Sequence, residues 1–483
     1  MADFPAVKFQ LRHLFLPTDT ALFKKVLTLA LPVILGNLSR VLMNVVDVAM
    51  VGRLGAHALA AVGMGSVLVW TVLSFAYSIR TGVQTVTSRR LGEKRLSECG
   101  AALNNGLVFA AGTGVTLSVV GYLGTGVLIG FLLDDPSVIP LAETYTRWAF
   151  LSVVFVVIGY AFQGFFNGVE RTAVHMEVTV ISNILNVYLN AGLIFGSANL
   201  PDLLSTTPLG DLSFLAAFWT PFAFPALGVK GAALATLVAS AWMMAHYLVR
   251  ASLRDFRKGY GALTGRLNRQ VLKRVVSIAV PQGLQELGVM LVFVLFFKIT
   301  ALVGTLEVAA TEVVFTIMQA SFLPAAGFGI ACATLVGKYL GENTPDLAEV
   351  TILESVRWSI IFMGSMGIIF LLFPNQILSF FTRDETVIEL GSVALRILGV
   401  VQFADAVGMT LWFALSGAGN TKYPAIVEMT IAWFIFLPSC YVTAVIMDSG
   451  ILGSWISFGF YITLYASAMA WKVLKGDWKT IRV

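Results

Sequence analysis

The chain alternates between long apolar runs and short segments that carry charged residues, glycine or proline. A helix needs about 20 mostly apolar residues to cross a bilayer, and each run is long enough to do so. The predicted spans are residues 26–51, 58–88, 101–131, 138–164, 173–196, 227–249, 275–302, 308–337, 352–373, 386–414, 423–446 and 451–471. The pattern therefore predicts an all-α polytopic membrane protein with twelve transmembrane helices.

The first span also carries polar residues on one side. Asn37, Arg40, Asn44 and Asp47 follow one another at helical spacing, and at about 100° per residue they fall within about an 80° arc of one face. Lipid cannot hydrate a charged side chain, so charged residues in a span normally face the protein interior or a water-filled cavity. This face of the first span is therefore the first candidate for a functional site.

Composition narrows the class of protein. Of the 483 residues, 57% are hydrophobic and 12% are charged, and the mean hydropathy of +0.84 fits a membrane protein. The three cysteines and four histidines are scattered, which argues against a disulfide framework, a zinc knuckle or an intramembrane metalloenzyme. The chain also lacks a nucleophile motif, so we expect neither an enzyme nor a cofactor other than a coupling ion.

The basic residues indicate the orientation of the spans. If both termini are cytoplasmic, 23 Lys and Arg residues flank the spans on that side, against Arg53, Lys230 and Arg383 on the other. Cytoplasmic loops carry an excess of Lys and Arg, so we predict a multi-pass protein of the cell (inner) membrane with both termini in the cytoplasm. This topology accounts for the net charge of +5, and nucleic-acid binding is not needed to explain it.

An internal repeat divides the chain into two halves. A shift of 249 residues aligns Pro32 with Pro281, Gly55 with Gly304, Leu91-Gly92-Glu93 with Leu340-Gly341-Glu342, Arg147 with Arg396 and Gly168 with Gly417. We infer a duplication of two six-helix lobes, related by an axis along the membrane normal and with a cavity between them near the midplane. The expected units are an N-terminal lobe at 1–249, a basic cytoplasmic linker at 250–274 and a C-terminal lobe at 275–483.

The first half carries an insert that the second half lacks. It comprises 27 residues around 197–224, in the predicted outer loop between the fifth and sixth spans, and is rich in aromatic residues. Two interpretations remain open for this insert. It is either a helix that rests in the membrane interface or a lid over the cavity.

Three motifs resemble those of the multidrug and toxic compound extrusion (MATE) family. They lie at 46–55 (VDVAMVGRLG) in the first span, at 91–93 (LGE) after the second and at 417–421 (GAGNT) after the tenth. The resemblance covers nearly the whole chain and combines NorM-like and DinF-like features. It implies a transporter that exports organic, often cationic, compounds by alternating access, in exchange for inward Na⁺ or H⁺.

The same resemblance implies a cation site in the N-terminal lobe. In such proteins an acid on the first helix, here Asp47, acts with an Asn-x3-Asn pair on the fifth helix, here Asn186 and Asn190, and Thr236 matches a ligand position on the sixth. Oxygen atoms of these types are hard donors that suit Na⁺, so Asp47 is the expected Na⁺ ligand; the same carboxylate could carry a proton instead. The alternative for Asp47 is a helix–helix hydrogen bond without a transport role.

Further polar residues on these helix faces are candidate modulators of the site: Asn37, Arg40, Asn44 and Asn183. Arg40 either balances Asp47 or another acid, or marks a pocket that accepts anionic substrates, and both interpretations stay open. Arg80 raises the same question, although it lies nearer the inner end of its span, where its side chain can snorkel to the interface.

Acids in the C-terminal lobe indicate a second cation or proton site. Glu286 and Asp405 resemble acids that some NorM-like members carry on the seventh and tenth helices. A structural hydrogen bond is the alternative for both. Glu428 is a single acid on the eleventh span. The remaining candidates for lining the cavity are Gln282, Glu312, Gln319 and Gln402.

We therefore predict a cation-coupled antiporter for organic, cationic or amphiphilic compounds. Its expected partners are small organic molecules and the lipid bilayer, without nucleic acid, and its expected state is a monomer. The alternative is a lipid-linked oligosaccharide or lipid flippase of similar architecture. Such a flippase needs a cationic cavity for a pyrophosphate group, which Arg40 and Arg80 favour and the intramembrane acids disfavour.

Overall fold

The computed structural model describes residues 19–205, 213–219, 221–265 and 267–483. Within this part of the chain twelve helices are long and apolar enough to cross a membrane, and no β-strand occurs. They are α1 (Thr20–Gly52), α2 (Ala56–Gly92), α3 (Leu96–Leu132), α4 (Ile139–Gly168), α5 (Thr172–Phe195), α7 (Val229–Ser252), α9 (Arg269–Val303), α10 (Thr305–Gly341), α11 (Pro345–Leu372), α13 (Glu385–Gly417), the composite span Lys422–Ile446 and α16 (Gly450–Lys475). Each predicted span falls on one of these helices, so the predicted all-α fold with twelve spans is confirmed.

Shorter helices complete the chain: α6 (Leu200–Ser205), η2 (Ser213–Phe218), α8 (Arg254–Gly259), α12 (Pro374–Ser379) and η5 (Asp477–Thr480). The composite eleventh span consists of α14 (Lys422–Ile431), the π-helical η3 (Ala432–Phe436), α15 (Leu437–Tyr441) and the π-helical η4 (Val442–Ile446). Pro438 lies just after η3. Because proline lacks an N–H and its ring clashes with the carbonyl four residues earlier, the wider π turn at η3 accommodates this break in the helix.

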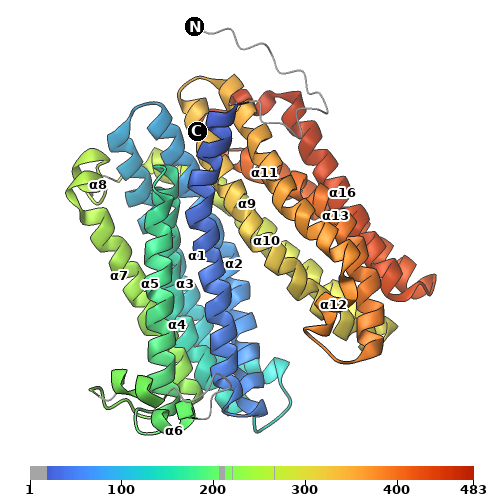
Figure 1. Ribbon diagram of the computed structural model, residues 1–483. Helices are drawn as coiled ribbons and strands as arrows, with labels where there is room; N and C mark the ends of the chain where they lie inside the picture. Colours follow the sequence, from blue (N-terminus) through green and yellow to red (C-terminus); the bar gives the residue numbers. More distant parts are fainter. Residues whose placement is uncertain (1–18, 206–212, 220, 266) are drawn as a thin grey trace.

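The two halves of the chain form two lobes with matching contacts. In the N-terminal lobe α4 packs against α2, α3 and α7, and in the C-terminal lobe α13 packs against α10, α11 and α16. The internal repeat relates these two sets of helices. Figure 1 shows the lobes close together at the end that carries the C-terminus and the start of α1, and apart at the opposite end. We call these the closed end and the open end. The stretch 250–274, predicted as a linker, contains the end of α7, α8 and the start of α9.

Two glycines related by the repeat allow the close approach at the closed end. A β-carbon on Gly92 of α2 would lie 1.9 Å from the carbonyl oxygen of Lys338 on α10, and one on Gly341 would lie 2.2 Å from the carbonyl oxygen of Arg89 on α2. Lys338 is itself the repeat counterpart of Arg89. The contact is therefore symmetric, as expected at the pseudo-two-fold axis that relates the two lobes. Only glycine fits at either position.

Polar contacts also join the lobes near the closed end. Lys338 Nζ lies 3.1 Å from Glu170 Oε1 in the turn between α4 and α5, and Lys25 Nζ of α1 donates a hydrogen bond of 3.3 Å to Tyr339 Oη of α10. Further from that end, Gln84 Nε2 of α2 donates a hydrogen bond of 2.9 Å to Thr334 Oγ1 of α10. These contacts join the two lobes toward the closed end.

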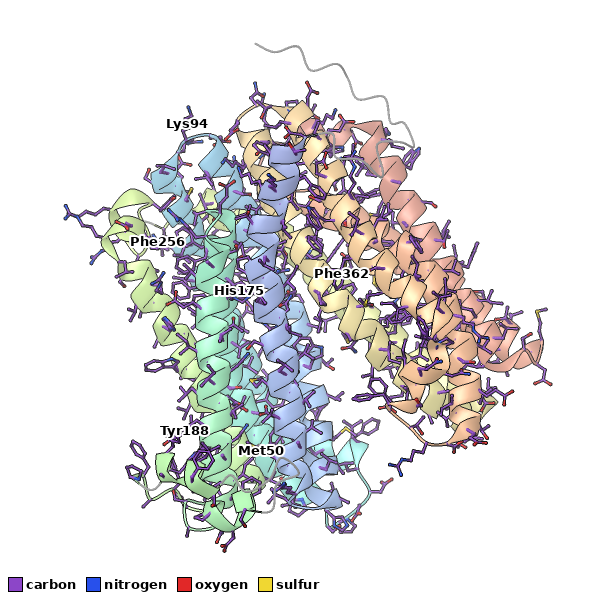
Figure 2. The ribbon with its side chains drawn as sticks, in the orientation of Figure 1. Met50, Lys94, His175, Tyr188, Phe256 and Phe362 are labelled. Atoms are coloured by element: carbon purple, nitrogen blue, oxygen red, sulfur yellow. The ribbon has the colours of Figure 1, made fainter. Side chains whose placement is uncertain are left out.

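The described part of the insert packs on its own lobe. Trp219 Nε1 donates a hydrogen bond of 2.8 Å to the carbonyl oxygen of Tyr188 on α5, and the two rings stack with their centroids 5.0 Å apart. Ala216 lies in a small apolar cluster that Met50 of α1 also contacts, and Figure 2 shows Tyr188 and Met50 at the open end. Three phenylalanines of the insert remain exposed, as the interfacial interpretation expects: Phe214, Phe218 and Phe222.

Candidate cation and substrate sites

Asp47 is the centre of a polar cluster between α1 and α5. Its Oδ1 accepts a hydrogen bond of 2.6 Å from Asn190 Nδ2, which also donates to Asn186 Oδ1 at 3.0 Å. Asn186 and Asn190 share a face of α5 because they lie four residues apart, and both are buried, whereas Asp47 is half-buried. Asn190 Oδ1 is buried without a hydrogen-bond partner in the described part of the chain. The structure thus brings together three of the four residues predicted for this site.

The fourth predicted ligand, Thr236, lies on α7 and is bonded to its own helix. Its hydroxyl donates a hydrogen bond of 3.1 Å to the carbonyl oxygen of Ala232. Tyr145 of α4 also lies within range of the Asp47 charge. The Tyr145 hydroxyl is 3.1 Å from Ser66 Oγ on α2. Sequence reasoning missed both residues, because a lone Tyr or Ser in an apolar span carries no spacing pattern that singles it out.

The polar residues along α1 contact more than one neighbouring helix. Asn37 Nδ2 donates a hydrogen bond of 3.0 Å to a backbone carbonyl of α10, so Asn37 joins the two lobes, about 15 Å along the helix from Asp47 at 1.5 Å per residue. Asn183 Nδ2 donates to Ser39 Oγ at 2.9 Å and ties α5 to α1. Asn44 is exposed. Only Asp47 itself belongs to the Asn186–Asn190 cluster.

Arg40 does not pair with Asp47. It is half-buried, and it makes neither a hydrogen bond nor an ion pair with any described residue. Its charge instead acts on His175 and Tyr247, which are buried and joined by a bond of 2.6 Å between His175 Nδ1 and Tyr247 Oη. Figure 2 shows His175 on α5, partway along the lobe. The Arg40 charge therefore acts on a buried group of hydrogen-bonded side chains.

Arg80 is fully buried, so the expectation that it snorkels to the interface is wrong. Its guanidinium carbon lies 4.2 Å from the centroid of the Tyr77 ring, a cation–π contact. Its three nitrogens have no hydrogen-bond partner among the described residues, and its charge reaches Glu286 of the other lobe. The side chain cannot reach the interface because α4 and α9 pack against α2.

Glu428 of α14 joins three helices in the C-terminal lobe. It accepts hydrogen bonds from Gln285 Nε2 on α9 and from Tyr461 Oη on α16, the latter at 2.9 Å. The two acids predicted here, Glu286 and Asp405, both lie close enough to feel the Glu428 charge. The structure therefore gathers three carboxylates in one region. Sequence reasoning gave Glu428 little weight because no motif marks it.

The predicted cavity-lining residues fall into two groups. Gln282 and Gln402 are both buried. Gln402 Nε2 donates a hydrogen bond of 2.9 Å to Ser321 Oγ. Neither amide atom of Gln282 has a hydrogen-bond partner among the described residues. Glu312 and Gln319 are exposed on the half of α10 nearer the open end. Because a carboxylate in a span avoids lipid, the exposure of Glu312 favours an aqueous surface there.

Multidrug resistance proteins are similar in sequence to this chain along nearly its whole length. The probable multidrug resistance protein NorM of Thermotoga maritima is 25% identical over 478 residues, which cover 98% of this chain and 97% of that protein. The multidrug resistance protein MdtK of Yersinia pseudotuberculosis is 23% identical over 470 residues, covering 94% and 95%. The similarity is thus not confined to one lobe.

Solved structures share the fold. An outward-facing multidrug resistance MATE family transporter has a TM-score of 0.82, with 19% identity, over 95% of this chain and 97% of that one. A MOP superfamily transporter from Pyrococcus furiosus, described as having a binding pocket of reverse polarity, has a TM-score of 0.82 with 20% identity, over 97% and 98%. At these identities the likeness establishes the fold alone.

The family itself follows from a profile match. The MatE profile matches residues 32–191 and 281–442, and the first residues of the two matches are 249 apart. This spacing equals the offset of the internal repeat, so the profile recognises each half in the same register. Because the two matches together cover more than half of the chain, the protein belongs to the MatE family and is a MATE transporter.

Proposed function

We propose that the protein is a cation-coupled antiporter, which exports organic cationic or amphiphilic compounds by alternating access and admits Na⁺ or H⁺ in exchange. The observation that carries this proposal is the Asp47–Asn190–Asn186 cluster, a carboxylate on α1 and two amides on α5, both of which are long and apolar enough to span a membrane. The names of the NorM and MdtK relatives support the export of drugs. They do not favour the alternative of a lipid-linked oligosaccharide flippase.

The donor set of the cluster suits a monovalent cation. The Asp47 carboxylate supplies one negative charge, and Asn190 Oδ1 is a buried carbonyl oxygen without a partner. Carboxylate and amide oxygens are the ligands that hard cations prefer. A proton on Asp47 would neutralise the same charge, so both coupling ions fit this site.

The first helix connects this site to the lobe interface. On α1, Asp47 is bonded to α5 of its own lobe and Asn37 is bonded to α10 of the other. A cation that changes the charge at Asp47 therefore acts on the helix that also holds the lobes together. Export is coupled to cation entry if cation and substrate favour different arrangements of α1.

Transport by purified protein in proteoliposomes tests the proposal. A Na⁺ gradient and a pH gradient are imposed separately, and efflux of ethidium is followed by fluorescence. We expect wild-type protein to respond to at least one gradient and Asp47→Asn to respond to neither, while still inserting into the membrane. The matched control is Glu385→Gln, an exposed acid in the first turn of α13, which should transport normally. Normal efflux by Asp47→Asn would refute the assignment.

A second candidate concerns substrate charge. Arg80 is buried without a hydrogen-bond partner in the described residues, and Arg40 also lacks an ion pair there. Two positive charges in the N-terminal lobe would accept an amphiphile that carries an anionic group. In the same assay, an anionic dye should then be exported by wild-type protein and lost in Arg40→Gln, with ethidium export retained. Equal loss of both dyes would exclude this role.

A further inference from the structure

A large cavity lies at the closed end, which the distribution of basic residues predicts to be cytoplasmic. Its volume is about 1400 Å³. Four segments line it: the junction of α2 and α3, the connection from α8 to α9, the turn between α10 and α11, and the C-terminal residues 479–483. We call this cavity the tail pocket.

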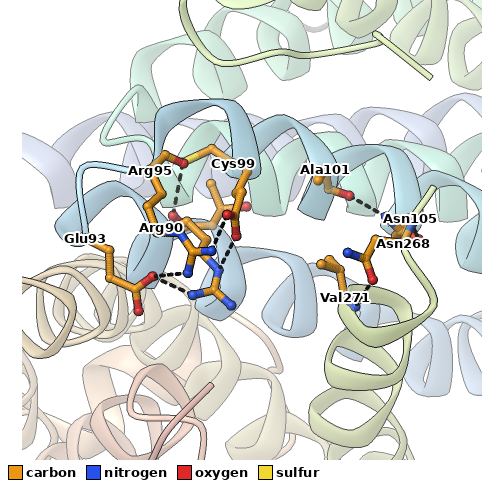
Figure 3. Close-up of polar contacts among 10 residues, drawn as sticks. Arg90, Glu93, Arg95, Cys99, Ala101, Asn105, Asn268 and Val271 are labelled. Atoms are coloured by element: carbon orange, nitrogen blue, oxygen red, sulfur yellow. Dashed lines mark hydrogen bonds and ion pairs between the residues drawn. The ribbon is translucent and has the colours of Figure 1, made fainter. Parts of the chain in front are cut away.

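The charge of the tail pocket is strongly positive. Eight of its lining residues are Arg or Lys and two are Glu. The two acids are neutralised locally. Glu93 Oε2 lies 2.5 Å from Arg90 Nη1 and 3.3 Å from Arg95 Nη1, and Glu98 also contacts both arginines. Figure 3 shows the Arg90, Glu93 and Arg95 contacts at the α2–α3 junction.

Five basic residues of the pocket form no ion pair with any described residue. They are Arg89, Arg257, Lys258, Arg274 and Arg482. Four of them are exposed, and Arg89 is only 5% exposed. Its Nη2 donates a hydrogen bond of 2.7 Å to the carbonyl oxygen of Ile481, while its Nε is buried without a partner. The positive charge of the pocket is thus largely uncompensated, and part of it is buried.

A second buried donor on the pocket wall also lacks a partner. Asn104 of α3 is 7% exposed; its Oδ1 accepts a hydrogen bond of 3.0 Å from the Leu263 amide, and its Nδ2 bonds to no described residue. The neighbouring Asn105 has a partner at each amide atom: its Oδ1 accepts from the Asn268 amide at 3.1 Å, and its Nδ2 donates to the Ala101 carbonyl at 2.8 Å. Figure 3 shows Asn105 between these two groups. The α8–α9 connection is therefore fixed on α3, and Asn104 keeps an N–H free.

Membrane topology alone does not explain this arrangement. An excess of Lys and Arg on the cytoplasmic side is satisfied by exposed loops, and it requires neither a cavity nor a buried guanidinium. Buried N–H groups are normally hydrogen-bonded. Arg89 Nε and Asn104 Nδ2 are buried donors without a hydrogen-bond partner among the described residues, whereas Arg90 Nε lies 3.2 Å from Glu98 Oε2. The partner that Arg89 and Asn104 lack is an acceptor, and the surrounding charge favours an anionic one.

We propose that the tail pocket binds a phosphate-bearing anion, whose oxygens accept hydrogen bonds from Arg89 and Asn104 and lie among the charges of Arg257, Lys258 and Arg274. Arginine matches the oxygens of a phosphate in a planar, forked geometry. A cavity of about 1400 Å³ exceeds the needs of one phosphate and admits a ligand with several. Two sources share this chemistry: the headgroup of an anionic lipid, because basic pockets beside spans bind such headgroups, and a soluble polyphosphate.

Because the tail pocket lies between the two lobes, a ligand bound there affects the equilibrium between arrangements of the lobes. Its lining comes from both lobes and from the C-terminal segment, and Arg89 of the N-terminal lobe is hydrogen-bonded to Ile481 of that segment. Because the complete pocket exists only while the lobes meet at the closed end, an anion bound there favours the arrangement with the other end open. The ligand acts in this way whatever the transported compound is.

Binding is measured on the purified full-length protein with two probes. In nanodiscs of phosphatidylcholine with or without cardiolipin, native mass spectrometry counts the cardiolipin that the protein retains. In phosphatidylcholine nanodiscs alone, calorimetry measures the binding of ATP. Retention of cardiolipin without ATP binding identifies a lipid headgroup as the ligand, and the converse identifies a soluble polyphosphate. Failure of both probes to bind would overturn the proposal.

Paired variants separate the pocket from general surface charge. Arg257→Gln/Arg274→Gln removes two charges that line the pocket, whereas Arg254→Gln/Lys273→Gln removes two exposed charges from the same helices, α8 and α9, outside its lining. We expect about tenfold weaker binding or more in the first pair and little change in the second. Equal losses in both pairs would show that the charge of the surface, and not the pocket, attracts the anion.

A single substitution tests the buried donor directly. Asn104→Asp keeps the oxygen that accepts from the Leu263 amide and replaces the free N–H group with a carboxylate oxygen, which repels phosphate. Binding should fall at least tenfold while the thermal melting temperature measured without the probe stays within a few degrees. Unchanged binding in Asn104→Asp would refute the proposed contact. None of these measurements depends on transport, so they stand apart from the test of Asp47.

Discussion

The ion pair between Glu170 and Lys338 gives the sharpest test of how the lobes are held together. Glu170 lies in the N-terminal lobe and Lys338 in the C-terminal lobe, with both Glu170 oxygens within 3.2 Å of Lys338 Nζ. Glu170→Gln removes the charge and keeps the shape of the side chain. The pair is broken whenever the lobes separate at the closed end, so the variant should favour arrangements in which that end opens.

The expected magnitude follows from the burial of the pair. An exposed ion pair contributes about 0–1 kcal/mol, and a hydrogen bond to a charged group contributes about 1.5–3 kcal/mol. The side chains of Lys338 and Glu170 are 19% and 22% exposed, which places this pair between the two cases, at roughly 1–1.5 kcal/mol. The equilibrium between the two arrangements should shift about five- to tenfold, since about 1.4 kcal/mol is a factor of ten.

Distances between spin labels at the open end measure this equilibrium. The native cysteines are buried, so labels attach to cysteines introduced at Val127 of α3 and Phe380 after α12, which are 78% and 86% exposed. Pulsed electron–electron double resonance measures the distance between the two labels. The Glu170→Gln variant should show a larger population with the shorter label-to-label distance than the wild type. The control is Asp477→Asn, which removes the 2.6 Å pair with Lys472 inside one lobe. An unchanged distribution in Glu170→Gln, or an equal shift in the control, would refute the reasoning.

Two further predictions concern buried positions. Arg80→Leu should raise the melting temperature of the detergent-solubilised protein, because burying a charge costs about several kcal/mol of desolvation per ion, and an apolar side chain avoids this cost. A lower melting temperature would show that the stacking on Tyr77 outweighs the cost of burial. Gly92→Ala should populate the arrangement with the closed end separated in the same spin-label experiment, because its β-carbon would lie 1.9 Å from the Lys338 carbonyl oxygen. Gly52→Ala is its control, since nothing lies within 4 Å of a β-carbon there, and equal behaviour of the two alanine variants would contradict the prediction.

The sequence by itself was sufficient for the helices and their repeat. Apolar runs of span length form helices because every backbone N–H and C=O must be bonded within the membrane, and this requirement is local. The repeat can likewise be read from the sequence, because identical residues such as Gly92 and Gly341 lie 249 positions apart. The pairing of Asn186 with Asn190 is equally local, since residues four apart share a helix face.

Contacts between helices could be predicted only where a family resemblance supplied them. The resemblance linked Asp47 to Asn190, which the structure shows bonded. It also linked Thr236 to this site, and in the structure the Thr236 hydroxyl donates a hydrogen bond to the Ala232 carbonyl oxygen of its own helix. The partner of Asn37 could not be predicted either. Helical spacing places Asn37 on the same face of α1 as Asp47, but it does not show which neighbouring helix packs against each end of that face.

The tertiary structure alone decided which polar groups meet. Glu428 gains its importance from Gln285 and Tyr461, which come from two other helices, and Arg80 is buried because α4 and α9 enclose its helix. The tail pocket likewise collects basic residues from three segments that lie far apart along the chain. Each case depends on how helices pack across long sequence separations. Local periodicity determines the face of a helix on which a residue lies, but the packing of the two lobes determines what that face contacts.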